Sequence, residues 1–219
     1  MFPFLSQMAP RPPSRDINSR GKIRSPRGAV RIVGGQWKRT LLPVIDIPGL
    51  RPTPDRVRET AFNWLTHLFG GSLVGQSALD LFAGTGALGL EAASRGADPV
   101  VLAERDHAAL EALYAIRTRL DARQVHIRSG DAVSVAKQFI DAETYFGIVF
   151  LDPPFREGWL ARMLPLAAGL CNSTGVLYAE SEGPLDASVL TACRLELIRM
   201  GKAGDVFYHL LRRNNRAQQ

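Results

Sequence analysis

The hydrophobic residues from position 77 onward form short runs that alternate with segments of helical periodicity. The apolar runs predict strands at 78–82, 100–103, 125–128, 147–151 and 175–179. The periodic segments between them predict helices at 88–94, 107–121, 132–140 and 158–170. Two later strands, 194–199 and 206–211, can pair as an antiparallel hairpin across a turn at 200–204. This alternation predicts an α/β fold, with a mostly parallel seven-stranded sheet, helices on both faces and an antiparallel hairpin at its edge.

The pattern before residue 72 is different. Residues 30–33 alternate, Gly34-Gly35 signals a turn, and residues 37–44 can return as a second strand, which predicts a small β-hairpin. A helix should follow, with Thr53 as its cap and Pro54 and Asp55 in its first turn. Its apolar stripe consists of Val57, Ala61, Trp64, Leu65, Leu68 and Phe69, and Gly70-Gly71 should end it. The side chains of Arg56, Arg58 and Glu59 lie off this stripe, so we expect them to reach solvent or a ligand.

These patterns divide the chain into three parts. Residues 1–26 are expected to form a basic, largely disordered tail, residues 27–71 the hairpin and helix, and residues 72–219 the main α/β domain. Residues 1–40 hold nine basic side chains and one acid, which gives +8, whereas the whole chain carries +6. A basic arm ahead of a near-neutral domain fits contact with nucleic acid phosphates. For the tail itself, a solvated segment that only keeps the protein soluble is an equally good interpretation.

Composition excludes several classes of protein. The chain is 46% hydrophobic and 22% charged, which are ordinary values for a packed soluble domain. Its strongly apolar runs are far shorter than the roughly 20 residues that span a membrane. Two cysteines and four scattered histidines give little support to a disulfide framework or a metal site. The first residues do not resemble a signal peptide, so we expect a cytoplasmic protein, and nothing requires more than a monomer.

A glycine-rich turn after the first predicted strand is the first candidate site. Gly84, Gly86 and Gly89 match the G-x-G-x-x-G pattern of dinucleotide-binding folds, which alone is weak evidence. Ligands of open parallel sheets bind beyond the carboxyl ends of the strands, where Phe82 and Thr85 also lie. Asp80 precedes the turn. An acid there suits a cationic amino group better than a pyrophosphate, which favours S-adenosylmethionine over NAD.

Two further acids follow the next strands. Glu104, beside Arg105, comes after the second strand and can accept both ribose hydroxyls of a nucleoside. Asp131, beside Ala132, comes after the third strand. It could hydrogen-bond the exocyclic amine of adenine or cap the next helix, and the two roles are compatible.

The segment Asp152-Pro153-Pro154-Phe155 is the most specific of these signals, and it follows a buried strand. The prolines fix the backbone and carry no N–H donors, which leaves the Asp152 carboxylate and backbone carbonyls as acceptors. Two acceptors that hold the hydrogens of an exocyclic amine could localise its lone pair and point it at a methyl sulfonium. Phe155 could stack on a base flipped out of its helix or loop.

Together these motifs resemble the Rossmann-like class I methyltransferases that use S-adenosylmethionine and act on exocyclic amines. Residues 31–38 and 49–65 resemble more narrowly the N-terminal signature of the RsmD family, the bacterial 16S ribosomal RNA guanine-N2 methyltransferases. The resemblance runs from about Val30 to the last strand and leaves out residues 1–26. It implies a substrate of assembled small ribosomal subunits, with no metal and no membrane.

The resemblance also implies roles for individual residues. The cofactor would be held by Asp80, Phe82, Gly84, Thr85, Gly86, Glu104, Arg105, Asp131 and Ala132, with Arg51 and Thr53 closing over its methionine end. The target guanine would be held by Asp152, Pro153, Pro154 and Phe155. RNA would be bound by Arg31, Trp37, Lys38, Arg39 and Arg56.

Three alternatives stay open on the sequence. The nearest is an adenine-N6 methyltransferase acting on DNA or RNA, because the Asp152 to Phe155 motif serves that chemistry too. The others are an NAD-dependent oxidoreductase, which Asp80 argues against, and a non-catalytic RNA-binding protein.

Overall fold

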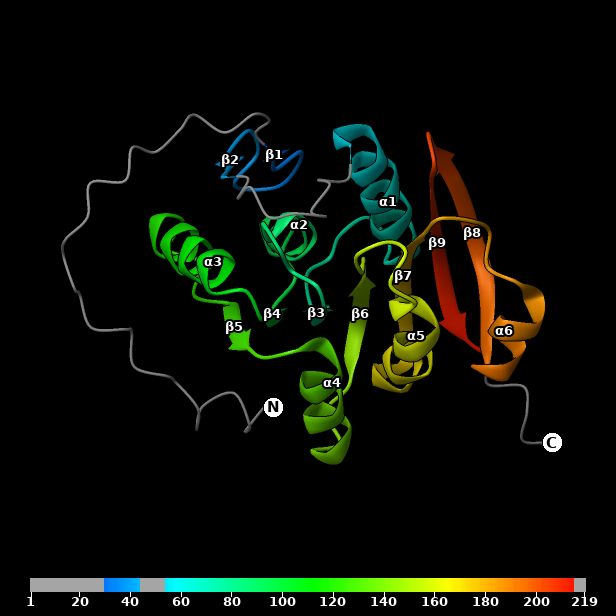
Figure 1. Ribbon diagram of the computed structural model, residues 1–219. Coiled ribbons are helices and arrows are strands. Elements are labelled where there is room, and N and C mark those ends of the chain that lie inside the picture. The colour runs from blue at the N-terminus through cyan, green and yellow to red at the C-terminus, as the bar shows by residue number, and fades with distance from the viewer. Residues whose placement is uncertain (1–29, 44–53, 215–219) are drawn as a thin grey trace.

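A seven-stranded sheet forms the centre of the computed structural model, which describes residues 30–43 and 54–214 (Figure 1). Its strands, in spatial order, are β5 (Val125–Ser129), β4 (Val100–Glu104), β3 (Ala78–Asp80), β6 (Phe146–Leu151), β7 (Cys171–Ser181), β9 (Val206–Arg213) and β8 (Leu195–Ala203). The first five pair in parallel, and β9 runs antiparallel to both of its neighbours. This confirms the predicted sheet and its edge hairpin.

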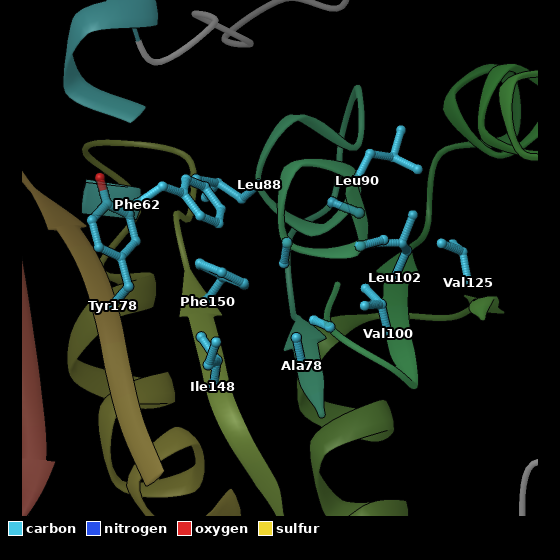
Figure 2. Packing of buried hydrophobic residues seen from close by; sticks show 14 of the residues in the cluster. Phe62, Ala78, Leu88, Leu90, Val100, Leu102, Val125, Ile148, Phe150 and Tyr178 are labelled. Carbon is cyan, nitrogen blue, oxygen red and sulfur yellow. The ribbon is translucent and has the colours of Figure 1, made fainter. Parts of the chain in front are cut away.

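Helices cover both faces of the sheet (Figure 1). Those on one face are α1 (Asp55–Leu68), α2 (Ala87–Ser94) and α3 (His107–Arg119); those on the other are α4 (Ala132–Asp141), α5 (Trp159–Leu170) and α6 (Ala187–Ala192). Successive residues of a strand point to opposite faces, and both faces here are buried. Ala78 and Ile148 therefore join the core under α1 and α2, seen in Figure 2, whereas Leu79 and Val149 join the core under α4 and α5.

The small hairpin packs on the sheet-distal side of α2, near its carboxyl end (Figure 1). It consists of β1 (Val30–Arg31) and β2 (Leu41–Leu42). The predicted second strand over 37–44 is too long, because residues 36–39 form turns and residue 44 lies outside the described residues. Ser94, the last residue of α2, explains the turn: its carbonyl accepts from the Gln36 amide at 2.8 Å, and its hydroxyl accepts from the Trp37 amide at 2.9 Å.

Close approach to α2 also explains the second glycine of the pair, Gly35. Gly35 has φ +76°, and a Cβ there would lie 1.9 Å from the Ser94 carbonyl oxygen. Only glycine fits a backbone that is both left-handed and in contact with its neighbour. The Ser94 hydroxyl donates to the Gly34 carbonyl at 2.6 Å, so the turn is joined to α2 from both sides.

The expectation that Arg58 reaches solvent or a ligand is wrong. Its side chain is fully buried, and its Nη2 donates to the Arg31 carbonyl at 2.6 Å and to Asp55 at 2.7 Å. Burial lowers the pKa of Arg58, whereas the negative charge of Asp55 acts to raise it. The buried cation therefore joins α1 to the hairpin instead of facing outward.

Two other sequence-based assignments change. Helix α6 was not predicted; it is a six-residue helix whose N-terminus is capped by Asp186, which accepts from the Ser188 amide. The predicted turn at 200–204 is mostly strand, because β8 continues to Ala203 and the turn comprises Gly204 and Asp205. Pro54 occupies the N-cap position of α1, one place earlier than expected, and Thr53 lies outside the described residues.

Candidate active site

A cavity of about 310 Å³ lies at the carboxyl ends of β3, β4, β6 and β7. Strand order reverses between β3 and β6, and ligands of doubly wound sheets bind at this switch point. Most of the predicted site residues line the cavity: Asp80, Phe82, Gly84, Thr85, Glu104, Arg105, Asp131, Ala132, Asp152, Pro153, Pro154 and Phe155. The topology thus brings together motifs that are up to 75 residues apart in sequence.

Some of the predicted residues lie elsewhere. Gly86 adjoins the cavity without lining it; with φ +79° it is the N-cap of α2, and its amide donates to the Ala83 carbonyl. Arg51 and Thr53 lie outside the described residues.

The described lining of the cavity is strongly acidic. It includes seven carboxylates, from Asp80, Glu104, Asp106, Asp131, Asp152, Glu157 and Glu180, and one basic side chain, Arg105. Such a lining attracts a cationic ligand and repels a pyrophosphate. The acidic lining therefore favours a ligand with sulfonium and ammonium charges over a dinucleotide, which carries a pyrophosphate.

Asp80, at the end of β3, is buried, with 1% exposure. Its two carboxylate oxygens accept from the Gly89 amide at 3.1 Å and the Phe82 amide at 3.3 Å, which hold the glycine turn and the start of α2 in place. Burial raises the pKa of Asp80 to about 7, and the negative charge of Glu104 adds to the rise. Asp80 is therefore poised to ionise when a cation enters the cavity.

Glu104 closes the glycine turn from β4. One of its oxygens accepts from the Gly84 amide at 2.7 Å, and the other accepts from the amides of Arg105 and Asp106 at 2.7 and 2.8 Å. A carboxylate has about four acceptor positions, so these three bonds leave about one position for a hydroxyl of a ligand. The same bonds fix the direction in which the carboxylate faces.

Asp131 is both a helix cap and a wall of the cavity. It is the N-cap of α4 and accepts from the Ser134 amide at 3.0 Å, and hydrogen bonds from Ser134 lower its pKa. Asp131 also lines the cavity, so its carboxylate can contact a ligand while it caps α4, and the two roles are compatible.

The Asp152 to Phe155 segment leaves β6, the neighbour of β3, and lines the same cavity as the glycine turn. The Arg156 amide donates to the Glu182 carboxylate, which ties the segment to the end of β7. Pro153 is buried, and Asp152 and Phe155 are partly buried. The acceptors predicted from the sequence are therefore held at the edge of the cavity by a short, rigid loop.

Two residues that sequence reasoning missed bear most directly on the chemistry of the lining, Glu180 and Trp159. Glu180 is 1% exposed and directly follows the apolar strand predicted at 175–179, as Asp152 follows the strand predicted at 147–151. Trp159 begins α5 and packs edge-on against Phe82, with ring centroids 5.6 Å apart. An acid that follows a buried strand was an available signal, whereas the position of Trp159 depends on tertiary packing.

The residues predicted to bind RNA lie outside the cavity lining. Arg31, Lys38, Arg39 and Arg56 are exposed on the hairpin and the first turn of α1, whereas Trp37 is partly buried against the core. Within the described residues, no helix has the length and apolar character to span a membrane.

Comparison with known proteins agrees with this architecture. The family model described as "Conserved hypothetical protein 95" matches residues 30–212. Ribosomal RNA small subunit methyltransferase D of Escherichia coli K12 is 42% identical over 188 residues, which cover 85% of this chain and 91% of the relative. The chain belongs to the RsmD family.

Other RsmD relatives and solved structures show the same likeness. The namesake protein of Haemophilus influenzae is 35% identical over 86% of this chain and 97% of its own length. The solved structure of yhhF from Escherichia coli is 41% identical, with a TM-score of 0.71, and covers 85% of this chain and 98% of that one. The described structure is accordingly a Rossmann-like class I methyltransferase fold.

Proposed function

We propose that this RsmD-family protein transfers a methyl group from S-adenosyl-L-methionine to the exocyclic N2 of a guanine in 16S ribosomal RNA. The observation that carries the proposal is the acidic cavity, in which the glycine turn after β3 and the Asp152 to Phe155 segment face one space. Its relatives are named as small-subunit ribosomal RNA methyltransferases, which supports the class of substrate.

The residues of the β3 and β4 ends fit the cofactor. The buried carboxylate of Asp80 suits its cationic methionine end, and Glu104 suits its ribose. Asp131 and Ala132 would lie at its adenine, where Phe82 and Trp159 offer aromatic edges. When bound, S-adenosylmethionine supplies an electrophilic methyl group on its sulfonium.

Asp152 and the backbone carbonyls beside it would hold the target amine. The lone pair of a guanine N2 is delocalised into the ring, so the free amine is a weak nucleophile. Acceptors that grip both of its hydrogens turn the lone pair out of the ring, toward the methyl donor. After transfer the amine is acidic, and its proton can leave to water or transiently to Asp152, so no base of unusual pKa is needed.

The exposed cations of the hairpin would carry the RNA. Lys38, Arg39 and Arg31 belong to one small element that is anchored on α2, so their charges move as a unit with the cavity. The substrate is the assembled small subunit, in which the hairpin can find RNA of fixed shape.

Methyl transfer to a panel of acceptors tests this function. The protein is incubated with labelled S-adenosylmethionine and unmodified small ribosomal subunits, their protein-free RNA, or duplex DNA. We expect label to enter the subunits most rapidly. Transfer to DNA alone would favour the adenine-N6 alternative, and no transfer despite tight cofactor binding would refute methyltransferase activity on these acceptors.

A further inference from the structure

We infer that Glu180 selects guanine over other purines by accepting the N1–H of the target base, an inference that rests on the proposed function. Glu180 lies at the end of β7, next to β6, whose end carries Asp152, and both side chains line the same cavity. It is a buried carboxylate to which the cofactor chemistry assigns no part.

The position of Glu180 is fixed by its neighbours. The Tyr178 hydroxyl donates to Glu180 Oε1 at 2.8 Å, and this buried hydroxyl also interacts electrostatically with Asp152. The ring of Tyr178 packs against Phe150 at 6.1 Å, with Phe62 beside it (Figure 2). Glu180 is therefore fixed by a hydrogen bond to a buried aromatic residue, and Asp152 lies within the electrostatic reach of the same residue.

A buried cation and a hydrogen-bond donor interact with Glu180. The buried Arg58 cation interacts electrostatically with it, and so does the Tyr178 hydroxyl, which donates a hydrogen bond. The other acids facing the cavity from β3, β4 and β6 are Asp80, Glu104 and Asp152. An ionised carboxylate can only accept hydrogen bonds. It therefore binds an N–H donor and repels a ring nitrogen that carries a lone pair.

The edge of guanine matches this arrangement. Guanine presents three donors side by side, N1–H and the two hydrogens of N2, whereas adenine presents an amine beside a bare N1. With the amine held by Asp152 and the adjacent carbonyls, the neighbouring ring position would face Glu180. Guanine then gains a charge-assisted hydrogen bond, and adenine or 2-aminopurine leaves a carboxylate against a lone pair. The Asp152 to Phe155 segment can hold the amine of either base, so the selection of guanine would come from Glu180 on β7.

The test replaces the target base. Small subunits are reconstituted with RNA that carries guanine, 2-aminopurine or adenine at the position the wild-type protein methylates, introduced by splint ligation. 2-Aminopurine keeps the reacting amine but lacks N1–H. We expect its kcat/KM to be roughly 10- to 100-fold lower than that of guanine with the wild-type protein. Glu180→Gln should narrow this preference at least about 10-fold, because an amide can donate to the bare N1.

Controls separate specificity from folding. Glu111→Gln, on the exposed side of α3, should keep the wild-type preference. Glu180→Gln retains an acceptor for Tyr178, and its affinity for S-adenosylmethionine reports whether the cavity is intact. Should this variant fail to fold, the wild-type comparison still decides, because equal use of guanine and 2-aminopurine would overturn the inference.

The failures of the two proposals are distinguishable. Methylated guanine from the wild-type protein, with the same purine preference in Glu180→Gln, would refute the role of Glu180 and leave the proposed function standing. No methylation of guanine by the wild-type protein would refute the proposed function and the inference with it.

Discussion

The affinity for S-adenosylmethionine should rise with pH, because Asp80 must ionise to meet the cationic end of the cofactor. Burial raises the pKa of this carboxyl to about 7 in the free protein. By that value about 3% of Asp80 is ionised at pH 5.5 and about half at pH 7.0. If the cofactor binds only the ionised form, its affinity increases ~16-fold over this range, or ~1.6 kcal/mol. The α-amino group of the ligand, with a pKa of about 7.7–8.0, stays protonated throughout.

Isothermal titration calorimetry between pH 5.5 and 7.0 measures this effect, with Asp80→Asn as the control. The variant should bind more weakly at pH 7.0 and show a much flatter dependence on pH. A second consequence concerns folding. Because the folded pKa is raised, the contribution of Asp80 to stability is fully present below pH 3.8 and is lost as pH rises to about 7. Affinity that is independent of pH in the wild-type protein, or an equal slope in Asp80→Asn, would refute this reasoning.

Three other variants test separate parts of the molecule. Asp152→Ala should reduce methyl transfer at least ~100-fold while the Kd for cofactor changes less than about twofold; near-normal turnover would contradict the acceptor role. Reversing the charges of Lys38 and Arg39 should weaken RNA binding and flatten the slope of log Kd against log salt by about 1.5, whereas reversing Lys137 on the opposite face should leave the slope unchanged. Arg58→Ala should lower the free energy of unfolding by about 3 kcal/mol in urea denaturation, because it empties a buried site and removes the hydrogen bonds to the Arg31 carbonyl and Asp55; a loss below about 1 kcal/mol would contradict its role as the link between α1 and the hairpin.

The sheet and most of the site could be predicted because their signals are local. Buried parallel strands read as short apolar runs, and acids mark their carboxyl ends: Asp80 is the last residue of β3, and Asp152 directly follows β6. The topology alone then places them at one edge. The same logic would have found Glu180, had an acid after the fifth strand been given equal weight.

What could not be predicted depends on distant partners. The turn after Gly35 is shaped by hydrogen bonds with Ser94 at the end of α2, about 60 residues further along the chain. The local alternation of apolar residues, which suggested a longer strand, does not contain this information. Arg58 is charged and off the apolar stripe, yet it is buried because the Arg31 carbonyl and Asp55 receive its hydrogen bonds. Such pairings appear only once the elements pack.

The identity of the methylated nucleoside tests the central claim most directly. Unmodified small subunits are treated with the protein and S-adenosylmethionine, the RNA is digested, and the nucleosides are separated and identified by mass spectrometry. The account predicts N2-methylguanosine with the wild-type protein and none with Asp152→Ala. N6-methyladenosine from the wild-type protein, or N2-methylguanosine in equal amount from the variant, would contradict it.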